Sequence, residues 1–82
     1  MPHVIVKLRA GRDEATRRAL TDHLTAAVTE TLGVGPDSVS VLLQDVEGEN
    51  WMSEVYGPNI EANADRLTKR PGYGPLAEQD AL

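Results

Sequence analysis

The sequence has 82 residues, which is enough for one small domain, so we expect a single domain over residues 1–82. It contains no cysteine, which excludes disulfides and thiolate metal sites, and two histidines are too few for a metal cluster. The net charge of −5 argues against binding to nucleic acid or an anionic membrane, and no apolar run reaches the length of a membrane span. No signal peptide is visible, so we expect a cytoplasmic location.

The first nine residues predict a short β-strand over residues 3–9. Its two faces alternate, with Val4, Val6 and Leu8 on one and His3, Ile5, Lys7 and Arg9 on the other. We expect the first face to join the core and the second to be partly exposed or to meet a partner. We expect His3 to pack, because it points away from its neighbour Pro2 along the pleat.

Pro2 lies directly before this strand. Initiator methionine is commonly removed when the next residue is small, and Pro2 would then carry a free secondary amine. That amine has no rotatable stem, so the fold alone sets its direction. It can act as a base if desolvation or nearby positive charge brings its pKa close to neutral. The simpler alternative is a proline that merely follows the start codon.

Residues 13–32 predict one long helix. Asp13 is a good N-cap, and Glu14 suits the first turn. Apolar side chains recur at three- and four-residue steps, and Gly33 is the residue that ends the helix. His23 borders the apolar stripe, so we expect it to pack or to make a hydrogen bond at the flank of the helix.

Residues 38–45 predict a second strand, which completes a βαβ unit with parallel strands and an α+β fold. Two strands alone do not make a stable sheet, and the chain contains no internal repeat. The sequence therefore predicts a homo-oligomer in which another copy of the unit completes the sheet.

The rest of the chain predicts a short helical turn at residues 51–56 and a last helix over residues 59–69. Pro58 suits the first turn of that helix, and Ile60, Ala64 and Leu67 would form its inner face. We expect the core to cover residues 2–70 and the tail, residues 74–82, to be loosely ordered.

Several of these features together resemble the 4-oxalocrotonate tautomerase superfamily. They are Met1-Pro2 before a strand, Gly11-Arg12 before a long helix, a second strand beginning Ser38-Val39, and Trp51. Glu49-Asn50 before Trp51, and the ending Lys69-Arg70-Pro71-Gly72-Tyr73, are similar to the dimeric phenylenolpyruvate tautomerase (PptA-like) branch. Those proteins carry a longer C-terminal segment than the short hexameric members.

The resemblance implies a fold in which two βαβ units form a four-stranded sheet with the helices on one face, followed by a C-terminal helix. It implies a keto–enol tautomerase, an isomerase, acting on 2-hydroxy-dienoate or aryl enolpyruvate acids. Pro2, freed by removal of Met1, is then the catalytic general base. Neither a metal nor an organic cofactor is expected.

Three further residues match family positions that bind substrate. Arg12 matches the carboxylate-binding arginine, in its own site or a neighbouring subunit's, and Trp51 matches the aromatic wall of the pocket. Ser40 stands where many hexameric members have a second arginine. Either another cation such as Lys7 or Arg9 compensates, or the preferred substrate differs. Each residue also has a purely structural interpretation: a solvated turn for Arg12, a core aromatic for Trp51 and an exposed strand position for Ser40.

Two alternatives to a tautomerase remain open on the sequence. Related proteins hydrate or dehalogenate small unsaturated acids, which needs a carboxylate that activates water, and Glu47, Glu49 and Glu54 are candidates. The other alternative is a non-catalytic dimeric interaction protein on the same fold. The longer C-terminal segment favours a dimer over a hexamer, because it occupies surface that further dimers would need.

Overall fold

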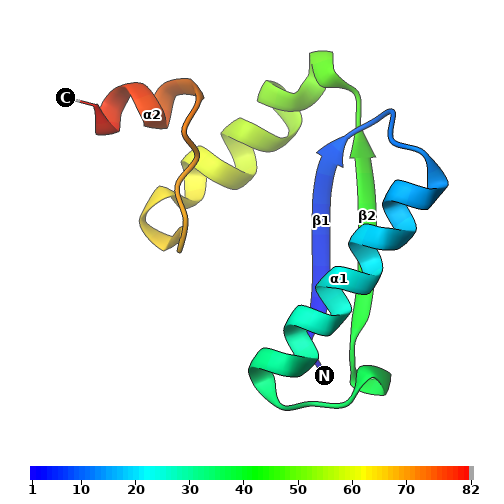
Figure 1. Ribbon diagram of the computed structural model, residues 1–82. Helices are drawn as coiled ribbons and strands as arrows, with labels where there is room; N and C mark the ends of the chain where they lie inside the picture. Colours follow the sequence, from blue (N-terminus) through cyan, green and yellow to red (C-terminus); the bar gives the residue numbers. More distant parts are fainter. Residues whose placement is uncertain (82) are drawn as a thin grey trace. The chain divides into compact units, whose positions relative to one another are not determined.

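The computed structural model describes residues 1–81. They divide into two compact units, which we call the N-terminal unit (residues 1–48) and the C-terminal unit (residues 49–81). The elements in chain order are β1 (His3–Arg9), α1 (Glu14–Leu32), η1 (Pro36–Ser38), β2 (Ser40–Val46), η2 (Gly48–Asn50), η3 (Met52–Ile60), η4 (Glu61–Arg66) and α2 (Gly74–Asp80) (Figure 1).

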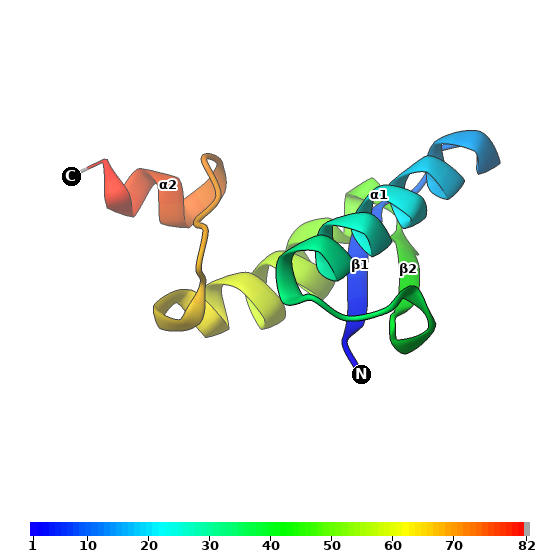
Figure 2. The same ribbon diagram turned by 60° about the horizontal axis from the view of Figure 1, so that its bottom comes forward.

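The N-terminal unit is a βαβ unit with parallel strands, as the sequence predicted. β1 and β2 pair in register from His3 opposite Ser40 to Arg9 opposite Val46. α1 lies across one face of the pair, and Figure 2 shows the helix and the strands as two layers. The even-numbered residues of β1 are half-buried and the odd-numbered residues are exposed. One face of the sheet is therefore covered by α1, and we call the opposite face the open face.

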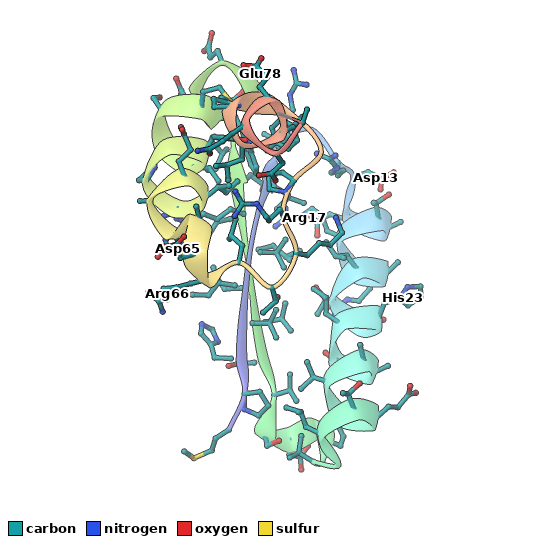
Figure 3. All side chains as sticks on the ribbon, turned by 90° about the vertical axis from the view of Figure 1, so that its left-hand side faces the viewer. Asp13, Arg17, His23, Asp65, Arg66 and Glu78 are labelled. Atoms are coloured by element: carbon teal, nitrogen blue, oxygen red, sulfur yellow. The ribbon has the colours of Figure 1, made fainter. Side chains whose placement is uncertain are left out.

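α1 begins and ends where the sequence predicted. The Asp13 carboxylate accepts a hydrogen bond of 2.8 Å from the backbone N–H of Thr16, and Gly33 ends the helix with φ of 70°. These hydrogen bonds with Thr16 hold the pKa of Asp13 below its usual value. His23 is exposed and points away from the sheet in Figure 3, so the expectation that it packs is wrong.

One ion pair joins α1 to β2. Arg17 reaches from α1 toward the sheet, and its Nη1 lies 2.7 Å from each carboxylate oxygen of Asp45 (Figure 3). Only 22% of the Arg17 side chain is exposed, so solvent screens this pair less than a fully exposed one. The pair fixes the helix against the carboxyl end of β2.

β2 begins two residues later than the sequence predicted. Residues Pro36–Ser38 form the 3₁₀ turn η1, in which both the backbone N–H and the hydroxyl of Ser38 bond the carbonyl of Gly35. A serine that bonds its neighbouring backbone favours a turn over a ladder position. The first residue of β2 is therefore Ser40.

The predicted boundary at Pro58 is wrong. Pro58 lies inside the π-helix η3, Met52–Ile60, and the 3₁₀ helix η4 follows directly and ends at Arg66. Proline lacks a backbone N–H and clashes with the carbonyl four residues earlier in an α-helix, so a regular α-helix is disfavoured through Pro58. Ile60, Ala64 and Leu67 are half-buried, in keeping with the inner face that the sequence predicted.

The buried side chains of the described residues are Val55, Tyr56 and Leu76, all in the C-terminal unit. Leu76 belongs to α2, which forms within the segment that we expected to be loosely ordered. The guanidinium of Arg70 binds both carboxylate oxygens of Asp80 at 2.8 and 3.1 Å, which raises the pKa of Arg70 and anchors α2. Leu82 lies outside the described residues. None of the helices in residues 1–81 combines the length and the apolar character that a membrane span needs.

Candidate active site

Pro2 immediately precedes β1 and is half-buried. Its carbonyl accepts a hydrogen bond of 3.2 Å from the backbone N–H of Ser40, so the ladder between the strands extends to this residue. Met1 is fully exposed, with a relative accessibility of 103%. The strand pair therefore holds Pro2 in place, while the residue before it projects freely into solvent.

Ser40 is the predicted site residue that lies beside Pro2. It opens β2 opposite His3, and its Oγ lies 2.6 Å from Nδ1 of that histidine. Both side chains are exposed on the open face. The packing role expected for His3 is therefore wrong, and its partner is the hydroxyl of Ser40. Ser40 thus joins Pro2 through its backbone and His3 through its side chain.

Arg12 lies at the other end of β1. It is exposed in the turn before α1, and its Nη1 donates a hydrogen bond to the carbonyl of Arg9. The seven residues of β1 separate it from Pro2, and a strand of that length spans roughly 23 Å. One chain therefore does not bring Arg12 to its own Pro2.

Lys7 and Arg9 were considered as cations that could compensate for the uncharged Ser40. The register places Lys7 opposite Gln44 and Arg9 opposite Val46, four and six positions along the sheet from Ser40. Those steps correspond to roughly 13 and 20 Å. Within one chain neither cation lies next to Ser40.

Trp51 belongs to the C-terminal unit, where Tyr73 binds it. Its Nε1–H donates a hydrogen bond of 2.8 Å to the hydroxyl of Tyr73. The Tyr73 ring meets the Tyr56 ring edge-on, with centroids 5.2 Å apart. Tyr56 is fully buried; its hydroxyl donates to the Tyr73 carbonyl at 2.8 Å and accepts from the Leu76 N–H at 3.1 Å. The indole of Trp51 is therefore held by one hydrogen bond to the half-exposed Tyr73, whose ring packs against the buried Tyr56.

The candidate carboxylates for water activation are all exposed. Glu47 directly follows β2, so it lies at the opposite end of the strand pair from Pro2. Glu49 and Glu54 belong to the C-terminal unit. In the N-terminal unit, the strand register places the imidazole of His3 and the hydroxyl of Ser40 at the same end of the sheet as Pro2.

Sequence reasoning missed one contact in each unit. In the N-terminal unit, His3 alternates away from Pro2 along its own strand, but the register pairs it with Ser40 in the other strand, and that register is the signal that could have found the contact. In the C-terminal unit, the sequence gives Tyr73 only as part of the ending that resembles one branch, and it bonds Trp51.

The N-terminal unit is thus a parallel βαβ unit with Pro2 directly before its first strand. Comparisons with known proteins show which family this fold belongs to. The family model described as "Tautomerase enzyme" matches residues 2–59. A "Probable tautomerase" of Xylella fastidiosa is 48% identical over 77 residues, covering 94% of each chain. "Tautomerase PptA" of Cronobacter sakazakii is 41% identical over 75 residues, covering 89% of this chain and 97% of its own.

The chain belongs to the tautomerase family, in the 4-oxalocrotonate tautomerase superfamily and its PptA-like branch. It is a tautomerase, and therefore an isomerase. The resemblance seen in the sequence is confirmed, and so is the α+β class with parallel strands.

Proposed function

We propose that the chain is a cofactor-free keto–enol tautomerase in which the free amine of Pro2 is the general base. The observation that carries the proposal is the position of Pro2: the Ser40 N–H holds its carbonyl, and Met1 is fully exposed for removal. Removal matters because Met1 turns the prolyl nitrogen into a tertiary amide, which has no basicity.

The reaction moves one proton. In the ketonisation of an enol acid, the enol O–H bond breaks, the C–O bond becomes a carbonyl, and a C–H bond forms at the neighbouring carbon. The neutral Pro2 amine takes the proton from the oxygen side, and the resulting prolinium returns a proton to carbon. A base works best when its pKa lies near the working pH. A dry pocket and nearby cations both favour the neutral form of an amine.

We propose aryl enolpyruvates and 2-hydroxy-dienoates as the substrate class, with aryl acids better placed. Ser40 can donate one hydrogen bond to a substrate oxygen but adds no charge, so a substrate with a second anionic group gains little there. Trp51 is proposed as the apolar wall against an aryl group, for which its anchored indole is suited. The proposal includes a cytoplasmic location.

The active assembly is proposed to be a homodimer whose four-stranded sheet joins two N-terminal units. No side chain of the described N-terminal unit is fully buried, and Ile5 and Leu42 on the open face remain 54% and 43% exposed. A second copy would cover such surface. It would also supply Arg12 to the Pro2 of its partner, which the length of β1 prevents within one chain. The guanidinium would bind the substrate carboxylate in a bidentate manner.

The test is the ketonisation rate of phenylenolpyruvate for the wild type and for Pro2→Ala, after mass spectrometry has shown that Met1 is absent. We expect a wild-type rate well above the buffer reaction and a loss of at least about 100-fold in the variant, the usual contribution of a general base. An equal rate in both proteins would show that another residue is the base. No rate above buffer would favour a hydratase-like or a non-catalytic protein.

A further inference from the structure

We infer that His3 is a positioning residue that orients the hydroxyl of Ser40 toward the 2-oxygen of the substrate. The inference rests on the proposed function, because it names the group that meets the oxygen whose proton Pro2 moves. It assigns a role in substrate binding to His3, for which the sequence predicted only packing.

The geometry of the pair supports this role. Nδ1 of His3 and Oγ of Ser40 are 2.6 Å apart, at the short end of the range for a hydrogen bond. The two residues are register partners at the first position of the sheet, and both side chains are exposed on the open face. An exposed hydrogen bond of this kind contributes little to folding, because water can replace either partner. Stability alone therefore does not explain the pair.

The position of the pair relative to Pro2 supports it further. The backbone N–H of Ser40 bonds the carbonyl of Pro2 itself, at 3.2 Å. The residue that carries the hydroxyl therefore also makes a backbone hydrogen bond to Pro2 across the strands. The hydroxyl of Ser40 and the prolyl amine therefore lie at the same end of the strand pair.

The chemistry of the two groups matches what a keto–enol substrate needs. A neutral imidazole can present Nδ1 either as an acceptor or, in the other tautomer, as a donor. When Nδ1 accepts from the Ser40 hydroxyl, the serine lone pairs are left to accept from an enol O–H. When Nδ1–H donates to Ser40, the serine O–H is left to donate to a ketone oxygen. The pair can therefore complement both forms of the substrate without a net charge.

The experiment measures how strongly the protein prefers an acid that has the 2-oxygen. The dissociation constants of phenylpyruvate and of 3-phenylpropanoate, which lacks that oxygen, are determined by calorimetry for the Met1-free protein. We expect phenylpyruvate to bind about twofold to tenfold more tightly, the contribution of one hydrogen bond. Ser40→Ala should bring this ratio close to one.

Variants at position 3 separate a positioning role from a structural one. His3→Phe keeps a ring but has no polar atom, so the ratio should fall as in Ser40→Ala, and the double variant should show no further loss. His3→Asn should restore part of the preference, because its amide group has a polar atom where Nδ1 lies. Gln44→Ala, on the same face of β2 and opposite Lys7, is the matched control and should leave the ratio unchanged.

Three results would overturn the inference: equal affinity of the wild type for the two acids, no measurable binding of either, or additive effects of the two single variants. These outcomes are distinct from failure of the proposed function, which the Pro2→Ala rate decides. A Pro2-dependent ketonisation with an unchanged ratio in His3→Phe would leave the tautomerase mechanism in place and remove His3 from it.

Discussion

The indole N–H of Trp51 donates a hydrogen bond of 2.8 Å to the hydroxyl of Tyr73, which lies 22 residues further along the chain. Trp51 is the proposed wall for the aryl group, and its orientation depends on Tyr73, a residue to which the sequence assigned no role in the site. Tyr73→Phe removes the acceptor and keeps the ring. We expect the KM for phenylenolpyruvate to rise about twofold to tenfold with little change in kcat, the scale of one lost hydrogen bond. Steady-state kinetics checks this, and an unchanged KM would exclude a role for the bond in binding.

Tyr56→Phe is the control for that variant. It also removes one tyrosine hydroxyl from the cluster, but that hydroxyl is fully buried and bonds the Tyr73 carbonyl and the Leu76 N–H. Its loss leaves the buried Leu76 N–H without an acceptor and the Tyr73 carbonyl without this donor. We expect a loss of about 1–3 kcal/mol in the free energy of unfolding, measured by urea denaturation. A variant as stable as the wild type would contradict the anchoring role of this hydroxyl.

Gly74 is predicted to be irreplaceable at the start of α2. Its φ is 75°, and a Cβ added there would lie 2.7 Å from atoms of the Tyr56 side chain. We expect Gly74→Ala to lower the free energy of unfolding by about 1–3 kcal/mol, because it combines backbone strain with a clash against a buried ring. Gly72→Ala is the matched control, since a Cβ there meets nothing within 4 Å. Equal stability of the two variants would contradict this account.

Much of the N-terminal unit could be predicted from the sequence, because its signals are local. The period-two pattern of β1, the Asp13 cap and Gly33 each act through neighbouring residues, and the structure has them as expected. The site was harder to predict, because its contacts join residues far apart in sequence. The bond between His3 and Ser40 depends on the strand register, which a single sequence does not show. The helix boundary at Pro58 was predicted wrongly because a π-helix has no clear sequence pattern.

The Asp13 cap predicts a specific dependence of stability on pH. The hydrogen bonds with Thr16 lower the pKa of Asp13 in the folded state. The stabilisation by the ionised carboxylate is therefore fully present when the pH is above the pKa of the unfolded chain, about 3.9. This stabilisation is lost as the pH falls through the lowered pKa of Asp13 in the folded protein. Asp13→Asn keeps a capping oxygen without the charge. We expect its melting temperature to lie below that of the wild type by a constant amount above pH 5. This difference in melting temperature should shrink below about pH 4. A difference that stays constant in acid would contradict a cap that depends on charge.

The distance between Pro2 and Arg12 predicts complementation between two inactive variants. If each site takes Arg12 from the partner, a dimer of one Pro2→Ala chain and one Arg12→Ala chain contains one intact site. After mixing and refolding in equal amounts, we expect about a quarter of the wild-type activity, because half of the dimers are mixed and each has one working site. No recovery would show that Arg12 serves the site of its own chain, whereas an Arg12→Ala protein that is active alone would show that Arg12 serves no site. Sedimentation of the same samples checks that they are dimers, and a mass near six subunits would contradict the proposed assembly.

The proposed mechanism depends on the free amine of Pro2. The most direct measurement uses one polypeptide in two states: the chain with an N-terminal fusion joined to Pro2, before and after a protease removes the fusion and leaves Pro2 as the first residue. We expect phenylenolpyruvate ketonisation to stay at the buffer rate before cleavage and to appear in proportion to the freed N-terminus. The same rate before and after cleavage, in a fusion that sedimentation shows to be a dimer, would contradict it.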